Sequence, residues 1–178
     1  MERYEIRLSG SGGQGLILGG IILAEGAIKD GRNSVQTQSY GPEARGGASK
    51  SEVIISSEEI DFPKVRNCDI LLSLTQKAYD EYNEGLKEDG ILIVDSSVNA
   101  VKSGNIKIYS IPIIDSAVKD LGKPMVTNIV ALGALVEITK VISKESLEKA
   151  VLDRVPKGTE ELNRKALAKG YEIAKTLM

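Results

Sequence analysis

The fold is decided by one stretch near the start of the chain, Tyr4-Glu5-Ile6-Arg7-Leu8-Ser9-Gly10-Ser11-Gly12-Gly13-Gln14-Gly15. Its first residues alternate between apolar and polar side chains, which predicts a strand over 4–8. A glycine-rich turn follows, and a run of apolar residues predicts a helix over about 14–29. A strand, a glycine turn and a helix in this order are typical of an α/β fold.

The chain beyond this stretch continues to alternate between strands and helices. Strands at 34–40 and 51–55 flank a loop rich in glycine and proline without a helix between them, which favours an antiparallel pair. Continuously apolar strands at 69–74 and 90–95 enclose a charged helix at 76–86, as expected for buried parallel strands. A further strand is expected at 106–111, and helices at about 117–120, 128–140, 144–153 and 160–176.

These elements predict a single α/β domain over residues 1–178. We expect a Rossmann-like three-layer arrangement with a mixed, mostly parallel sheet and helices on both faces. Gly19 and Gly20 interrupt the first helix, which is tolerable if another backbone approaches closely there. Ser143 is the expected N-cap of the helix at 144–153, and Asn128 is expected to cap the helix that follows it.

Composition excludes several kinds of chemistry. The 178 residues include no histidine, no tryptophan and one cysteine, Cys68, and 23 Lys and Arg face 25 Asp and Glu. Without histidine there is no Ser-His or Cys-His pair, and one cysteine cannot hold an iron–sulfur cluster. A net charge of −2 gives no broad attraction to nucleic acid or membrane. With a charged start and no apolar run long enough to span a bilayer, the chain is expected to be cytoplasmic.

The turn Gly10-x-Gly12-x-x-Gly15 follows the order of a dinucleotide-binding fingerprint. Free N–H groups at the start of the helix would favour an anion. The acidic residue expected about 20 residues later is missing, because the second strand ends Gln38-Ser39-Tyr40. Leu16 stands where a P-loop requires lysine. The alternatives are a bound anion, the backbone of a partner, or a turn whose glycines serve only packing.

A second unusual loop reads Tyr40-Gly41-Pro42-Glu43-Ala44-Arg45-Gly46-Gly47. Its three glycines and one proline fix an unusual backbone path and leave room for a close neighbour. Arg45 is a planar, permanently charged donor suited to carboxylate or phosphate. Equally, the loop can be a hairpin tip with a surface pair between Glu43 and Arg45.

Two further residues have candidate roles. Asp95 ends a parallel strand, where α/β sheets bind ligands, but it can equally cap a turn with Ser96 and Ser97. Cys68 opens an apolar strand, and we expect a buried structural thiol there.

Together, the stretches at 10–15 and 39–47 resemble the gamma subunit, or gamma domain, of 2-oxoacid:ferredoxin oxidoreductases, and the resemblance covers the whole chain. The form of the second loop looks closer to gamma subunits acting on 2-oxoglutarate or branched-chain oxoacids than to pyruvate-type chains. The resemblance implies a holoenzyme that converts a 2-oxoacid and coenzyme A into acyl-CoA, CO2 and reduced ferredoxin.

The resemblance also implies how the work is divided. Thiamine diphosphate, magnesium and iron–sulfur clusters would lie on alpha, beta and delta-type partner subunits, ferredoxin would be reached through the complex, and this chain alone would bind no cofactor and catalyse nothing. Its loops would contact those subunits and the coenzyme A site. The residues assigned to these contacts are Gly10, Ser11, Gly12, Gly13, Gln14, Gly15, Tyr40, Gly41, Glu43, Arg45, Gly46 and Gly47.

Two other functions compete with this one. A free-standing Rossmann-type nucleotide-binding oxidoreductase would use the glycine turn for NAD, although the missing acidic residue counts against it. A pure interaction module would bind neither ligand nor catalytic partner, although it would not need glycines concentrated in two loops.

Overall fold

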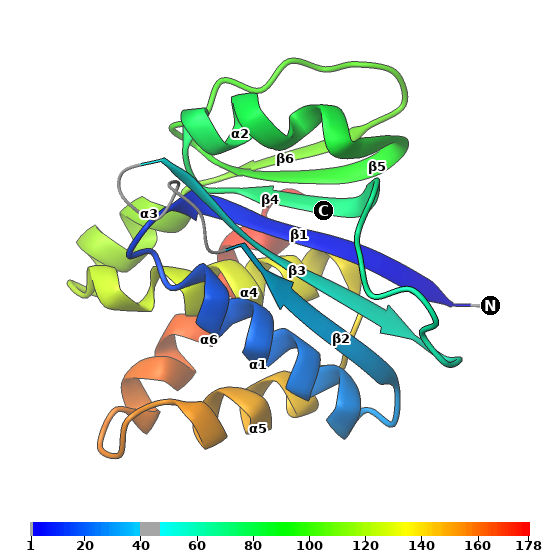
Figure 1. The fold of residues 1–178 in the computed structure, drawn as a ribbon. Coiled ribbons are helices and arrows are strands. Elements are labelled where there is room, and N and C mark those ends of the chain that lie inside the picture. The colour runs from blue at the N-terminus through cyan, green and yellow to red at the C-terminus, as the bar shows by residue number, and fades with distance from the viewer. Residues whose placement is uncertain (1, 40–46) are drawn as a thin grey trace.

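A mixed sheet forms the middle of the molecule (Figure 1). The computed structural model describes residues 2–39 and 47–178, and in these residues six strands are ordered β2-β3-β1-β4-β5-β6. Their bounds are β1 Arg3–Ser11, β2 Asn33–Gln38, β3 Ala48–Ser56, β4 Cys68–Ser73, β5 Leu86–Asp95 and β6 Lys107–Ile111. Only β3 is reversed: it pairs antiparallel with β1 and β2, whereas β1, β4, β5 and β6 pair in parallel. The expected antiparallel pair and the mostly parallel sheet are both confirmed.

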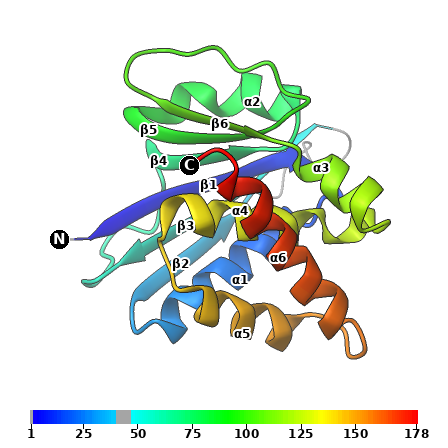
Figure 2. The same cartoon turned by 180° about the vertical axis from the view of Figure 1, so that it is seen from behind.

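Helices cover both faces of the sheet, as the two opposite views show (Figures 1 and 2). One face carries α1 (Leu16–Lys29), α4 (Thr127–Thr139), α5 (Lys144–Arg154) and α6 (Glu160–Lys175). The other face carries α2 (Gln76–Tyr82). The predicted three-layer α/β fold is therefore confirmed. No helix in the described part of the chain is long and apolar enough to cross a membrane.

The strands divide their side chains between two apolar cores. Val53 and Ile55 of β3 belong to the core under α1 and α4, whereas Ile54 between them belongs to the core under α2. This alternation follows from the two-residue period of a strand. It explains why β4 is apolar at every position from Ile70 to Leu72, because a strand buried on both faces needs apolar residues in both directions.

Two predicted helix boundaries are wrong. Helix α2 ends at Tyr82, a short 3-10 turn spans Asn83–Gly85, and β5 begins at Leu86, so residues 83–86 are not part of an α-helix. The side chain of Asn83 donates to the carbonyl oxygens of Tyr79 and Asp80, which offers the backbone an alternative to continuing the helix. The helix expected at 117–120 is a π-helical turn, Ser116–Asp120, that continues a short α3, Ile113–Asp115.

Gly19 and Gly20 were expected to be tolerable in α1 if another backbone approached closely, but side chains are their nearest neighbours. A Cβ on Gly20 would collide with the side chain of Ser51 on β3, so the neighbour of this helix is a side chain of the sheet and not a backbone. The backbones of α4 and α6 do approach closely, because a Cβ on Gly133 would lie 2.6 Å from the carbonyl oxygen of Leu167. Small residues allow this crossing.

The C-terminal end of α1 is tied to the start of α5. Ser143 caps α5 as predicted, since its Oγ accepts from the N–H of Ser146 at 3.1 Å. The carboxylate of Asp30 accepts from Ser143 N at 2.6 Å, Ser143 Oγ at 2.7 Å and Ser146 Oγ at 2.6 Å. Burial opposes ionisation of Asp30, but the hydrogen bonds from Ser146 and Ser143 outweigh it, so the pKa of Asp30 lies below its usual value.

Candidate functional site

The glycine turn lies at the carboxyl end of β1, beside the end of β4. The helices that follow these two parallel neighbours, α1 and α2, lie on opposite faces of the sheet (Figure 1). Such a switch point opens a crevice at the edge of the sheet, where α/β proteins bind ligands. At this edge the hydroxyls of Ser9 and Ser73 are hydrogen-bonded across the two strands at 2.8 Å.

The turn is held by a side chain of its own. Gln14 Oε1 accepts from the N–H of Ser11 at 2.7 Å, and the N–H of Gln14 donates to the carbonyl of Ser11 at 3.3 Å. Gly13 and Gly15 have φ values of +87° and +74°, a conformation that favours glycine. Because the N–H of Gln14 is used within the turn, it is not available for an anion or a partner.

No side chain caps the first backbone N–H groups of helix α1 in the described residues. Gly15 occupies its N-cap position and provides no side chain, and no acidic residue lies in the first turn. The first hydrogen bond of the helix runs from Gly19 N to Gly15 O at 2.9 Å. The N–H groups of α1 that come before Gly19 therefore have no acceptor within the helix, and they carry its positive partial charge.

Asn128 has a different role from the predicted cap. Helix α4 begins one residue earlier, at Thr127, and Val126 is its N-cap. The side chain of Asn128 instead donates from Nδ2 to the carbonyl oxygen of Gly15 at 3.0 Å, and thereby ties α4 to the glycine turn. Sequence reasoning missed this contact because 113 residues separate the two partners.

The end of the second glycine stretch lies next to the first. Tyr40, Gly41, Glu43, Arg45 and Gly46 are outside the described residues, whereas Gly47 is a half-buried bend before β3. Register then places Ala48 opposite Ser11 and Ser49 opposite Gly10. The reversed direction of β3 thus brings the ends of both stretches to one edge of the sheet.

A cavity of about 250 Å³ lies between them. It is lined by the turn, by the first residues of α1 and by Ser49 of β3, that is by Ser11, Gly13, Gly15, Leu16, Ile17, Leu18 and Ser49. Ser49 was not among the predicted site residues. Its position just after the second glycine stretch, at the start of an antiparallel strand, is the signal that identifies it.

Asp95 and Cys68 have structural roles. Asp95 is 2% exposed, and its carboxylate accepts from Ser97 N at 2.9 Å, Ser97 Oγ at 2.6 Å and Ile114 N at 2.8 Å. Of the two predicted roles it therefore has the capping one, with Ser97 as its partner. The expectation for Cys68 is confirmed: the thiol is buried, and burial raises its pKa to about 11.

The strand order differs from that of a dinucleotide-binding half. In such a half the first two strands are neighbours, and the acidic residue at the end of the second reaches the ribose. Here β3 lies between β1 and β2, and β2 ends with Gln38. The site therefore lies at the glycine turn of an α/β domain whose first strands are ordered differently from those of a dinucleotide-binding half. The N–H groups of this turn suit an anion or the backbone of a partner.

Comparison with known proteins identifies the family. The sequence profile described as pyruvate ferredoxin/flavodoxin oxidoreductase matches residues 5–173. A 2-oxoglutarate synthase subunit, KorC of Methanocaldococcus jannaschii, is 56% identical over 179 residues, covering 98% of this chain and 96% of that protein. The chain therefore belongs to the pyruvate ferredoxin/flavodoxin oxidoreductase family, as a gamma subunit of a keto-acid:ferredoxin oxidoreductase.

Solved structures agree with this assignment. The gamma subunit of a keto/oxoacid ferredoxin oxidoreductase from Geobacter sulfurreducens superposes with a TM-score of 0.91 at 54% identity, over 99% of this chain and 98% of that one. The fold also matches, with a TM-score of 0.89 at 24% identity, 32% of a chain of the Magnetococcus marinus 2-oxoglutarate:ferredoxin oxidoreductase, a structure with 2-oxoglutarate, coenzyme A and succinyl-CoA bound. The predicted resemblance is confirmed, and the chain is one subunit of a larger oxidoreductase.

Proposed function

We propose that this chain is the non-catalytic gamma subunit of a cytoplasmic, thiamine-diphosphate-dependent 2-oxoglutarate:ferredoxin oxidoreductase. The complex would convert the 2-oxoacid and coenzyme A into acyl-CoA and CO2, with ferredoxin as the electron acceptor. The full-length match to a 2-oxoglutarate synthase subunit supports the choice of substrate. The observation that supports the subunit role is the pairing of Gly10 with Ser49, because it brings Gly47, the end of the second glycine stretch, close to the first at one edge of the sheet.

The composition of the chain supports placing the chemistry on other subunits. One cysteine cannot ligate an iron–sulfur cluster, and no group of three or more His, Cys, Asp or Glu in the described residues could hold a metal. Thiamine diphosphate with magnesium, and the clusters, would therefore be held by alpha, beta and delta-type partners. The Magnetococcus marinus structure, in which a similar fold forms about a third of a longer chain, supports a close association with such partners.

The glycine turn has groups suited to coenzyme A or to a partner backbone. Its bare helix start favours a phosphate, and the small cavity beside Ser49 opens at the same place. We propose that Arg45 provides the positive charge for a phosphate of coenzyme A, and that the N–H groups of Gly12, Gly13 and Gly15 donate hydrogen bonds to it. Binding of coenzyme A by the Magnetococcus marinus enzyme supports the ligand class.

Kinetics of the purified complex test this proposal. Arg45→Ala is expected to raise the KM for coenzyme A, or to weaken assembly, while the chain stays folded. Arg164→Ala is a matched control, because Arg164 of α6 forms an exposed ion pair with Glu148 of α5. Unchanged assembly together with an unchanged KM in Arg45→Ala would make Arg45 an ordinary surface residue.

Two assays test the wider assignment. Oxoacid-dependent reduction of ferredoxin by the native complex, measured with several 2-oxoacids, should be fastest with 2-oxoglutarate. Calorimetric titration of the isolated chain with NADH should give no tight binding, because β3 separates β1 from β2. Tight binding of NADH would instead support the free-standing nucleotide-binding enzyme.

A further inference from the structure

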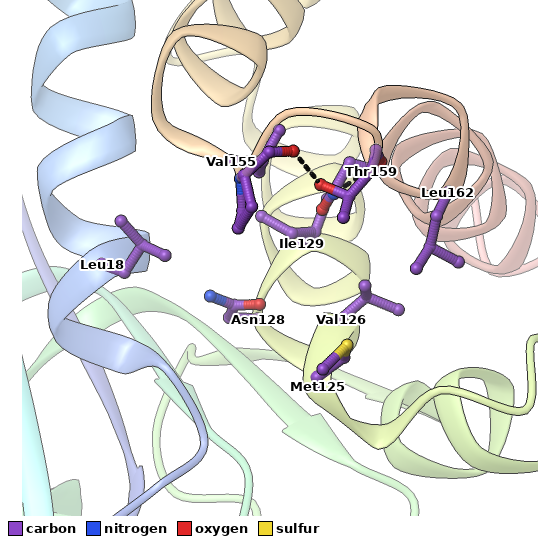
Figure 3. Close-up of a pocket in the computed structure, with 10 residues that line it drawn as sticks. Leu18, Met125, Val126, Asn128, Ile129, Val155, Thr159 and Leu162 are labelled. Atoms are coloured by element: carbon purple, nitrogen blue, oxygen red, sulfur yellow. Dashed lines mark hydrogen bonds between the residues drawn. The ribbon is translucent and has the colours of Figure 1, made fainter.

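A second, apolar pocket lies beside the glycine turn, between α1, α4 and the connection from α5 to α6 (Figure 3). Its volume is about 200 Å³. Leu18, Val126, Ile129, Val155 and Leu162 provide most of its walls, and Met125 is 75% exposed. The described residues that line it carry no charged side chain.

A buried polar atom of this pocket, Asn128 Oδ1, lacks a hydrogen-bond partner in the described residues. Thr159 Oγ1 donates to Pro156 O at 2.7 Å, and Asn163 Nδ2 donates to Thr159 O at 2.9 Å, so these two side chains have hydrogen bonds. Asn128 is 5% exposed, and its Oδ1 has no hydrogen-bond partner within the described part of the chain. The Gly15 carbonyl fixes the orientation of the amide, because it accepts only from Nδ2.

A buried oxygen without a partner loses hydration, which costs about 1–3 kcal/mol unless a donor arrives. In Figure 3 the oxygen of Asn128 points away from α1, on the side of Val126 and Ile129. Met125, a long and flexible side chain, lines the same pocket and can change its rotamer when a group enters. The occupant that satisfies the pocket therefore has an apolar body and a hydrogen-bond donor.

The volume of the pocket and its uncharged lining restrict the occupant to one class of side chain. Pockets for ligands and cofactors usually measure about 300–1,000 Å³, so this one has room for a single ring or side chain. The uncharged lining disfavours Lys and Arg, because a buried charge needs a partner. Tyr and Trp combine an apolar ring with an O–H or N–H donor, and they are enriched among the residues that anchor protein interfaces.

We infer that this pocket receives a tyrosine or tryptophan side chain from another subunit of the oxidoreductase, and that the ring donates a hydrogen bond to Asn128 Oδ1. The inference rests on the proposed role in assembly. Continuity supports it, since Leu18 lines both this pocket and the cavity of the glycine turn, and Asn128 holds that turn. The docked ring would thus fix the glycine turn relative to the partner.

Leu18→Trp tests this inference, because a ring on α1 would fill the pocket from within the chain. Ile28→Trp is the matched control, since Ile28 lies on the same helix, is 59% exposed and does not line the pocket. Each chain is titrated against the remaining subunits of the complex. We expect Leu18→Trp to weaken assembly about tenfold or more, as for loss of an interface anchor, and Ile28→Trp to match the wild type.

The chain has no tryptophan of its own, so the fluorescence of the new ring reports whether it is buried in a folded protein. If Leu18→Trp is folded and assembles as well as Ile28→Trp, the inference is wrong. A wild-type chain that binds no other subunit would contradict the proposed function as well, which distinguishes the two failures.

A measurement on the unmodified chain covers the case in which Leu18→Trp does not fold. p-Cresol and toluene differ by one hydroxyl group, and both fit a single-ring pocket. We expect p-cresol to bind roughly fivefold more tightly and to shift the side-chain amide resonances of Asn128 in NMR spectra, because it provides the missing donor. Equal affinities, or shifts remote from Asn128, would overturn the inference.

Discussion

The two ends of helix α1 are built in opposite ways. At the C-terminal end, the carboxylate of Asp30 receives three hydrogen bonds from Ser143 and Ser146 and fixes α5. At the N-terminal end, Gly15 provides no cap, and Asn128, whose amide donates to the Gly15 carbonyl, keeps an oxygen without a partner in the described residues. Within the described residues, the chain itself provides the hydrogen-bond partners at one end, the closed end, whereas the other end, the open end, keeps a buried oxygen without a partner.

This difference separates polar groups that act within the chain from those that the proposed function assigns to a ligand or partner. Polar groups at the closed end contribute to folding, whereas those at the open end contribute only when a ligand or partner supplies what is missing. Variants at the closed end should therefore change the free energy of unfolding. Variants at the open end should change assembly and coenzyme A use in addition.

The largest effect is expected for Gly15→Ala, at the open end. Its φ of +74° strains any Cβ, and that Cβ would lie 2.5 Å from Nδ2 of Asn128. We expect a loss of about 2–4 kcal/mol in the free energy of unfolding, together with weaker assembly of the complex. Denaturant titration and pull-down of the other subunits measure the two effects.

Gly13→Ala separates the effect of backbone strain from the effect of the contact with Asn128. Gly13 has a φ of +87°, but a Cβ there would meet nothing within 4 Å. This variant should lose only the strain, about 1–2 kcal/mol. Equal losses in Gly13→Ala and Gly15→Ala would show that the contact with Asn128 contributes nothing.

At the closed end, Asp30→Ala should cost less, about 1–2 kcal/mol, because the carboxylate is exposed although it receives three hydrogen bonds. Assembly of the folded chain should be unaffected. Asp153→Ala is the control, since Asp153 pairs with Lys29 at the same end of α1 but is 62% exposed. Thermal unfolding compares them, and equal midpoints would contradict a role for Asp30.

Acidification should reduce the contribution of Asp30 to the stability of the folded chain. The pKa of Asp30 in the folded chain lies below its usual value of 3.8, so its contribution is complete above that pH and is lost as the pH falls through the lower, folded-state pKa. The difference in stability between the wild type and Asp30→Asn should therefore shrink on acidification below about pH 4. Denaturant titrations over a pH series measure it. A difference that grew on acidification would contradict the assignment.

The smallest effect is expected in the middle of α1. At Gly19 the nearest atom to an added Cβ lies 3.7 Å away, so Gly19→Ala should stabilise the chain by about 0.5–1 kcal/mol through helix propensity. Gly20→Ala should have the opposite sign, because its Cβ collides with Ser51. Thermal midpoints of the two variants give the comparison, and a destabilised Gly19→Ala would show that the helix has no room there.

The sequence predicted the sheet and its layers well because its signals are local. Continuous apolar runs identify β4 and β5, and two strands without a helix between them identify the reversed β3. Helix ends were less predictable, since the side chain of Asn83 competes for backbone hydrogen bonds at the end of α2.

The candidate site could be predicted only in part. The glycine turn is visible in the sequence, and the pair of stretches identifies the family. The contact of Asn128 with Gly15 and the pairing of Ser49 with Gly10 depend on how distant segments pack, which no local pattern contains. Asn128 was predicted to be a cap because it immediately precedes an apolar run, and tertiary packing instead turned its side chain toward α1.

The reversed strand β3 also decides where the chain can change in length. Nine residue pairs fix its register against β1, from Arg3 and Ser56 to Ser11 and Ala48. An insertion or deletion within Ala48–Ser56 would shift this register and turn the following side chains to the opposite face of the sheet. The length of β3 is therefore constrained by both apolar cores at once, and by the place of Ser49 beside the glycine turn.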